Sequence, residues 1–309
     1  IMLILGCYSL PAAYAAANGV QVLRQTDYLT KMPDRRLVET AQIIVDVMQP
    51  GGLKPDGIGA RSAEKTRLMH AAIRHLIVHR PDHPWDAQQL GVPINQEDMA
   101  ATLMTFCYIV IDGLDRMGVT TTAEEKASYL AAWREVGRIM GVVPELLPDT
   151  FEQAEQLTRA IQADQVLGAD VPPDDPRWAD GRKMTGPLLA VLDDKTLPGV
   201  PTSLMRLFLP PHVADGLGVP HRPVNDYVVK TLVRGFGWFD RTMFERFGRR
   251  SRVLRSGSMR LMNHLLAWQR GGDRAPFRIP ESLHWYEDDD KPTVAQRVFE
   301  RSVAVTNRA

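Results

Sequence analysis

Residues 95–118 read NQEDMAATLMTFCYIVIDGLDRMG and predict one long amphipathic helix. Asn95 suits the N-cap position, because its side-chain oxygen can accept a hydrogen bond from a backbone N–H of the first turn. The main apolar residues then recur at helical spacing up to Gly118: Met99, Phe106, Val110 and Leu114. A face of this kind needs an apolar partner, so the pattern predicts a buried helix.

The same pattern continues on both sides of this segment. Thr122 with Glu125, and Thr150 with Gln153, are capping boxes that predict helices ending near Gly141 and Gly168. Upstream, helices are predicted over 63–79 and 34–48. The second carries one apolar stripe with a single threonine: Leu37, Thr40, Ile44 and Val47. No run alternates with the period of a strand, and the fold class is therefore predicted to be all-α.

Composition and length limit the remaining possibilities. The chain has 309 residues, a formal net charge of zero and 44% hydrophobic residues. This balance excludes a disordered chain and gives no overall attraction to nucleic acid. Residues 1–170 are predicted to form the ligand-binding helical core. Residues 171–309 begin with a loop over 171–186 that is rich in proline, glycine and aspartate, and they are predicted to add helices packed on that core, within the same domain.

The first 17 residues are apolar and carry no charge. We expect a buried helix or helix pair interrupted at Pro11, because the run is too broken for the roughly 20 apolar residues of a membrane span. Contact with a membrane and the remnant of a targeting segment remain as alternatives. Cys7 and Cys107 lie in apolar segments and are predicted to be buried thiols rather than a redox pair.

The segment 67–75, RLMHAAIRH, holds the most informative polar residues. Arg67, His70 and Arg74 are spaced i, i+3 and i+7 and share one face of a helix. Two guanidiniums beside an imidazole would be costly to bury without partners. Haem would supply partners for the imidazole and for the guanidiniums, because its iron binds imidazole and its propionates pair with arginine. The alternative is an amphipathic helix whose polar face meets water.

Three other residues could face the same ligand. Arg36 and Thr40 are neighbours on the 34–48 helix, and either can donate a hydrogen bond to bound dioxygen; Arg36 near a helix start is otherwise a surface residue. Thr102 interrupts the apolar face of the 95–118 helix, where a threonine usually bonds its own helix backbone.

A second histidine pattern suggests a different metal site. His75, His79 and His83 are spaced by four, and two such histidines can share an ion. Pro81 and Pro84 are predicted to end the helix before His83 joins the stripe. The chain contains no phosphate loop, dinucleotide fingerprint or nucleophile elbow.

The sequence resembles a known family, the catalytic domains of the MpaB-type oxygenases and the rubber oxygenases (latex clearing proteins). The resemblance covers roughly residues 1–240 and rests most on Arg-x-x-His-x-x-x-Arg-His at 67–75. It is also carried by four further stretches: LPAAYA at 10–15, RLVET at 36–40, the helix through Thr102, and ADGLG at 214–218.

The resemblance implies a globin-related helical core holding haem b, with His70 as the proximal ligand of the iron. It implies that Arg67 and Arg74 support the haem, that Arg36 and Thr40 lie at its pocket, and that Thr102 is a further pocket position. Two positions depart from the family. Glu39 stands where rubber oxygenases can carry a lysine able to approach the iron, and Met104 stands where members can carry a histidine. Both departures weaken the case for polyisoprene cleavage in particular.

We therefore expect a haem-dependent oxygenase that acts with dioxygen on a small apolar substrate, of isoprenoid or lipid-like character. A haem carrier or sensor without turnover would use the same residues. A relative that has lost haem, acting as an interaction module or hydrolase, is a third hypothesis. No nucleic-acid partner is expected, the oligomeric state is not predicted, and the cytoplasm is the default compartment.

Overall fold

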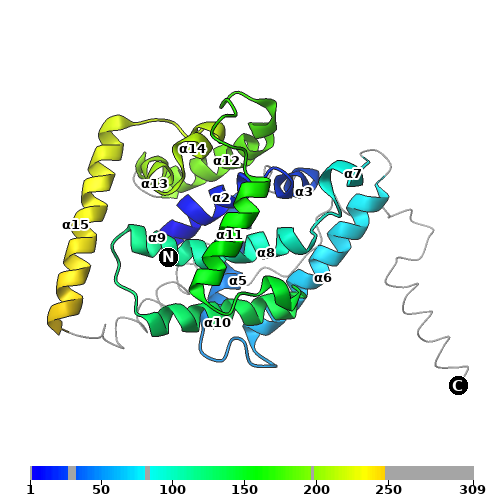
Figure 1. Ribbon diagram of the computed structural model, residues 1–309, viewed down its shortest axis with the longest axis horizontal. Coiled ribbons are helices and arrows are strands. Elements are labelled where there is room, and N and C mark those ends of the chain that lie inside the picture. The colour runs from blue at the N-terminus through cyan, green and yellow to red at the C-terminus, as the bar shows by residue number, and fades with distance from the viewer. Residues whose placement is uncertain (1, 27–32, 81–83, 196–197, 248–309) are drawn as a thin grey trace, which may run out of the picture. The chain divides into compact units, whose positions relative to one another are not determined.

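The computed structural model describes residues 2–26, 33–80, 84–195 and 198–247 (Figure 1). All of them belong to one compact unit, residues 1–275, and a second unit comprises residues 276–309. Within the described ranges every regular element is a helix, and the nearest approach to β structure is an isolated bridge between Ala16 and Val166. The all-α prediction is confirmed, while the globin-related arrangement stays a prediction.

The N-terminal segment forms the centre of the core. It consists of four short elements: α1 (Met2–Ile4), a π-helical turn η1 (Leu5–Ser9), α2 (Leu10–Tyr14) and α3 (Gly19–Thr26). Ile4 and Cys7 have no exposed surface, and Tyr8 stacks on Phe208 of a distant helix. The prediction of a buried interior segment is confirmed. These side chains are occupied by the protein, so the alternative of membrane contact through them finds no support.

Two helices carry the polar residues singled out above. α5 (Pro33–Met48) and α6 (Ile58–His79) pack against each other at very short range. A Cβ atom on Gly59 would lie 2.6 Å from the carbonyl oxygen of Asp46, so only glycine permits this approach. The buried carboxylate of Asp46 then accepts a hydrogen bond of 2.8 Å from the hydroxyl of Ser62, which links the two helices.

The three predicted N-caps are confirmed. Asn95, Thr122 and Thr150 each form a capping box. They open α8 (Gln96–Phe106), α10 (Ala123–Met140) and α11 (Phe151–Gln165).

The single helix predicted over 95–118 is wrong, because it breaks at Cys107 and continues as α9 (Tyr108–Arg116). The hydroxyl of Tyr129 donates 2.8 Å to the carbonyl of Phe106 and satisfies a group that the break exposes. The new direction buries three consecutive residues, Ile109 to Ile111.

The C-terminal half of the described chain adds further helices. The longer ones are α12 (Ala179–Lys195), α13 (Val200–Phe208), α14 (Pro211–Gly216) and α15 (Pro223–Phe247). Three short elements complete the described chain: α7 (Ala87–Leu90), η2 (Pro144–Leu146) and η3 (Pro176–Trp178). The loop predicted over 171–186 is wrong from Ala179 onward, where α12 has already begun. The division at residue 170 stays a prediction.

The prediction for the two cysteines is confirmed. Cys7 and Cys107 are free and buried, and burial raises the pKa of each thiol to about 12. In the described part of the chain, no helix combines the length and the apolar character that crossing a bilayer requires.

Candidate functional site

The inward face of α6 combines apolar and polar residues. Ala63 and Ile77 are buried at 1% and 3% exposure. His70 lies seven residues from each of them and therefore on the same stripe of the helix, yet its side chain is only half-buried while its Nδ1 atom is enclosed. The stripe of α6 that faces the core therefore carries an imidazole at its middle, at a position less enclosed than Ala63 and Ile77.

Both predicted arginines lie beside His70 and bind backbone carbonyl groups. Arg67 Nη1 donates 3.1 Å to the carbonyl of Ile139, in the last turn of α10. Arg74 donates from Nε to Pro93 (2.9 Å) and from Nη2 to Ile94 (2.5 Å), just before α8. The carbonyls at a helix C-terminus carry partial negative charge, so the Arg67 guanidinium stabilises the end of α10. The arginines thus tie α6 to its neighbours.

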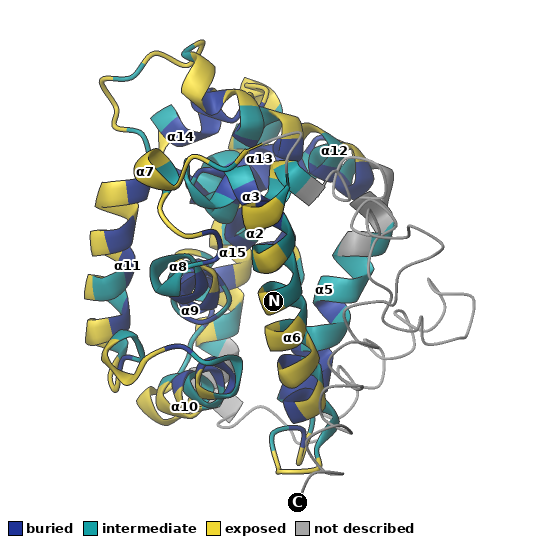
Figure 2. Ribbon diagram, turned by 90° about the vertical axis from the view of Figure 1, so that its right-hand side faces the viewer, coloured by how far each residue is buried: buried dark blue, intermediate teal, exposed yellow. Residues whose placement is uncertain are grey.

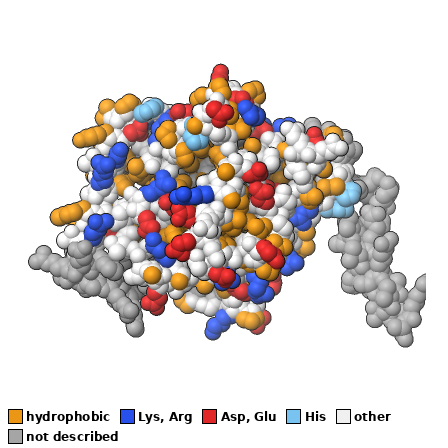
Figure 3. Space-filling model, viewed as in Figure 1, with side chains coloured by type: hydrophobic (Ala, Val, Ile, Leu, Met, Phe, Trp, Pro, Cys, Tyr) orange, Lys and Arg blue, Asp and Glu red, His pale blue; other side chains and the backbone are white. Residues whose placement is uncertain are grey.

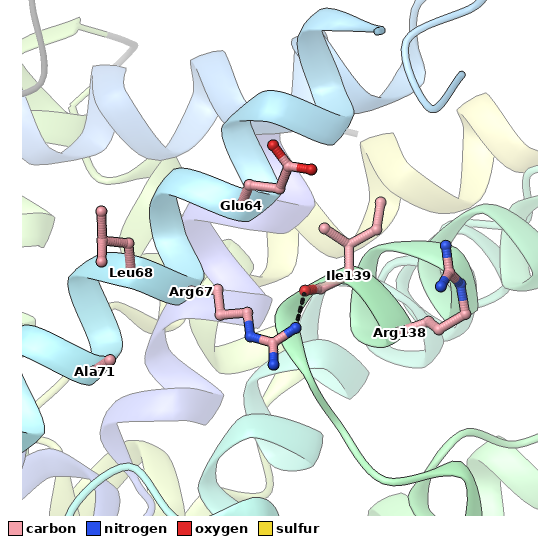
Figure 4. Close-up of a pocket in the computed structure, with 6 residues that line it drawn as sticks. All are labelled: Glu64, Arg67, Leu68, Ala71, Arg138 and Ile139. Carbon is pink, nitrogen blue, oxygen red and sulfur yellow. Dashed lines mark hydrogen bonds between the residues drawn. The ribbon is translucent and has the colours of Figure 1, made fainter. Parts of the chain in front are cut away.

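The surface beside Arg67 is hollowed into an open pocket of about 470 Å³ (Figure 4). The view shows the Arg67 guanidinium reaching from α6 to the carbonyl of Ile139, so it crosses the space between α6 and α10. Six residues line the pocket: Glu64, Arg67, Leu68, Ala71, Arg138 and Ile139. The sequence did not point to Arg138 or Ile139. Gly141, the left-handed cap of α10, marked a helix end there without indicating its partner.

On α5, the predicted stripe faces the core. Ile44 and Val47 are buried in the main cluster, and Thr40 is half-buried on the same side. The backbone of Arg36 lies in α5, but its side chain is outside the described residues. Glu39, the position that departs from the family, forms an ion pair of 2.9 Å with Arg35.

Thr102 lies on α8 and is exposed, although α8 is a central helix (Figure 2). Its hydroxyl donates 2.9 Å to the carbonyl of Asp98, as expected of a threonine within a helix. Met104, the second departure from the family, is buried in the core. The roles of Thr102, Thr40 and Arg36 at a pocket stay predictions.

Two members of the histidine repeat, His75 and His79, lie side by side on α6. The rings of His75 and His79 lie 4.1 Å apart, and the Nδ1 atom of His79 hydrogen-bonds the carbonyl of His75 at 2.7 Å. His83 lies outside the described residues. In the ranges that are described, no three His, Cys, Asp or Glu residues are arranged to hold a metal ion.

The ADGLG stretch at 214–218 has a packing role. A Cβ on Gly216 would lie 2.4 Å from the ring of the buried Trp178, and Gly218 has a left-handed φ of 71°. Both positions therefore require glycine. This stretch supports α14 against η3 and α12.

The comparisons with known proteins agree with this arrangement. The family model described as "ER-bound oxygenase mpaB/B'/Rubber oxygenase, catalytic domain" matches residues 2–242. The rubber oxygenase of Streptomyces sp. (strain K30) is 26% identical over 199 residues, which cover 63% of this chain and 47% of that protein. The chain thus spans about half the length of this relative.

A solved structure, that of latex clearing protein LCP in the closed state, has a similar fold. The TM-score is 0.65 at 21% identity, over 90% of this chain and 74% of that one. At this identity the likeness concerns the fold alone. The matched family model covers most of the chain, and the resemblance predicted from the sequence is confirmed: the chain belongs to the family of MpaB-type and rubber oxygenase catalytic domains.

Proposed function

We propose that this protein is a haem b-dependent oxygenase that acts on an apolar substrate. The observation that carries the proposal is the environment of His70, half-buried between Ala63 and Ile77 and flanked by two arginines. Family membership supports the oxygenase class. The environment of His70 supports the cofactor.

The residues present fit the chemistry of haem. A half-buried imidazole on an inward helix face would suit a ligand of the haem iron. Each guanidinium has five N–H donors, so the carbonyl bonds of Arg67 and Arg74 orient the side chains and still permit pairing with a propionate. His70 would therefore ligate the iron, and Arg67 and Arg74 would hold the propionates.

The protein's own residues would then control access and polarity. When bound, haem supplies the activation of dioxygen. The apolar side chains of α5 and α8, including Ile44 and Leu103, exclude water from the core. The hydroxyl of Thr40 and the guanidinium of Arg36 are proposed to donate hydrogen bonds to dioxygen, and Thr102 to line the pocket.

The substrate is proposed to be isoprenoid or lipid-like. This rests on the name of the rubber oxygenase relative and on the apolar surroundings of the helices that would enclose it. Polyisoprene itself is not singled out, because Glu39 and Met104 replace two residues that family members can carry near the haem. The carboxylate of Glu39 also has a partner within α5, because it forms an ion pair with Arg35.

The proposal is tested by the visible spectrum of the full chain purified from haem-replete cells. We expect a Soret band that is lost in His70→Ala. The matched control is His75→Ala, which removes an exposed imidazole of the same helix. A colourless wild-type protein with a native circular dichroism spectrum would contradict haem binding, as would a Soret band that survives in His70→Ala.

Turnover is tested separately from binding. Oxygen uptake by the haem-loaded protein is measured with a long-chain alkene or isoprenoid substrate, with His70→Ala as the control. Uptake that depends on substrate supports the oxygenase. A protein that binds haem but consumes no oxygen would instead be a carrier or sensor, and zinc or no metal on analysis would favour a relative that has lost haem.

A further inference from the structure

The long helix α15 has one face that belongs to the core. Val229 is buried, and Gly237 packs so closely on Gly118 that a Cβ on the latter would lie 2.8 Å from the Cα of Gly237. The carboxylate of Asp240 accepts a hydrogen bond of 2.9 Å from the backbone N–H of Thr120. These contacts fix the rotation of the helix and decide which residues point outward.

The opposite face of α15 is apolar and exposed. Seven large side chains define this surface, the outer face of α15: Val224, Tyr227, Val228, Leu232, Phe236, Trp238 and Phe239. Tyr227 is 74% exposed and Trp238 72% exposed, which is unusual for aromatic residues gathered on one helix. In Figure 1 the helix lies at the left margin of the described chain, and hydrophobic and basic side chains share that margin in Figure 3.

The polar groups on the outer face do not require water. The hydroxyl of Thr231 donates 2.8 Å to the carbonyl of Tyr227, and that of Thr242 donates 2.8 Å to the carbonyl of Trp238. Both hydroxyls are therefore satisfied within the helix, as they would have to be in an apolar medium.

The acidic and basic side chains of α15 lie on different sides of the helix. Of its acidic side chains within the described set, Asp226 binds Ser203 at 2.6 Å and Asp240 binds Thr120, so both turn toward the protein. Lys230, Arg234 and Arg241 are exposed and, at about 100° per residue, fall on one stripe along the edge of the outer face.

The sequence that follows is equally basic, with Arg249, Arg250, Arg252 and Arg255 and no acidic residue between them. In a chain of zero net charge, this region is a marked local excess of positive charge.

We propose that the outer face of α15 docks on the surface of an anionic lipid bilayer. A helix with aromatic and aliphatic residues on one face and lysine or arginine along its edge lies in the interface, with its apolar face among the acyl chains. Tyrosine and tryptophan are favoured at the headgroup level. The basic stripe of Lys230, Arg234 and Arg241 provides the charge complementarity that selects an anionic surface.

This docking would bring the protein to the phase in which lipid-like molecules reside. The inference is independent of the haem proposal, because it concerns binding to lipid and its test measures no activity. Loss of haem and loss of vesicle binding are therefore distinguishable.

The test is co-sedimentation of the full chain with vesicles. One set contains phosphatidylcholine with phosphatidylserine, and the other phosphatidylcholine alone. We expect binding to the anionic vesicles that weakens as salt is raised. Each basic residue near such a surface contributes roughly 5-fold in partitioning, so Lys230→Gln with Arg234→Gln and Arg241→Gln should weaken it on the order of 100-fold.

The apolar contribution is tested with Leu232→Ser and Phe239→Ser. The matched control is Leu68→Ser, an equally exposed leucine on α6. We expect the first two to lose vesicle binding and the control to keep it, with native circular dichroism spectra throughout. Equal binding by all three variants overturns the proposal.

Measurements in the absence of lipid would detect a different partner on the outer face of α15, such as residues 248–309 or a second copy of the chain. Acrylamide quenching is compared between wild type and Trp238→Phe in solution, together with the molar mass by light scattering. An accessible Trp238 in a monomer supports docking from solution. A Trp238 that is already shielded would mean that the face is covered by residues 248–309 or by a second copy, and the proposal would fail.

Discussion

α6 and α15 are the two longest helices of the described chain. Each departs from the usual amphipathic pattern, α6 with a polar residue on its inner face and α15 with apolar residues on its outer face. α6 turns an imidazole inward, on the stripe of Ala63 and Ile77, whereas α15 turns Trp238 and Phe239 outward. Ordinary helices place apolar residues inside and polar residues outside. An inward polar group therefore points to an internal ligand, and an outward apolar face points to an external partner.

The sharpest test of this contrast places the same charge on both helices. Ala63→Asp buries a carboxylate among apolar side chains at a position with 1% exposure. We expect it to lower the free energy of unfolding by more than about 3 kcal/mol, because an unpaired buried charge is strongly destabilising. Chemical denaturation measures the effect.

The counterpart is Thr231→Asp on the outer face of α15. It should change the free energy of unfolding by less than about 0.5 kcal/mol, as is usual for surface positions. If both substitutions cost the same, the assignment of inner and outer faces is wrong.

A second test concerns the contact between α5 and α6. Gly59→Ala gains helix propensity, but its Cβ would meet the backbone of Asp46 and Val47, which cannot move aside as a side chain can. We expect a net loss of about 1–3 kcal/mol in the free energy of unfolding. A stability equal to that of wild type would show that the two helices separate easily.

Arg74→Lys separates the tethering role of this residue from its charge. Lysine keeps the positive charge but cannot donate from two nitrogens to Pro93 and Ile94 at once. The free energy of unfolding should fall by about 1 kcal/mol. The control is Arg61→Lys, an exposed position of the same helix that should leave the midpoint of denaturation unchanged.

The smallest expected effect is a gain on α15. A Cβ added to Gly235 meets nothing within 4 Å, so Gly235→Ala brings no clash. It should raise the free energy of unfolding by about 0.5–1 kcal/mol, because alanine loses less backbone entropy in a helix. A decrease seen by thermal denaturation would indicate a neighbour that covers this position.

Local signals in the sequence predicted much of the fold. Capping boxes predict where three helices begin, because each box involves only residues three positions apart in the sequence. They start at Asn95, Thr122 and Thr150. The break at Cys107 had no such signal, since the hydroxyl that bonds the carbonyl of Phe106 there belongs to Tyr129, on another helix. The early start of α12 was hidden by the glycines and prolines of 171–186.

In the site, too, the sequence predicted local features but not contacts between distant segments. Spacing alone placed Arg67, His70 and Arg74 on one face of α6. It could not predict that Arg67 reaches Ile139 or that Arg74 reaches Pro93, because these acceptors are backbone carbonyls and carry no residue signature. The exposed face of α15 was likewise unpredicted, since amphipathic spacing gives an apolar side without telling which way it points.

The bond from Arg67 to Ile139 joins residues 72 positions apart. During synthesis, α6 would leave the ribosome before α10 exists, so this bond can form only after α10 has also been made. Arg74, whose acceptors lie about 20 residues away, can engage much earlier. The two arginines that flank His70 should therefore form their bonds at different times, Arg74 before Arg67.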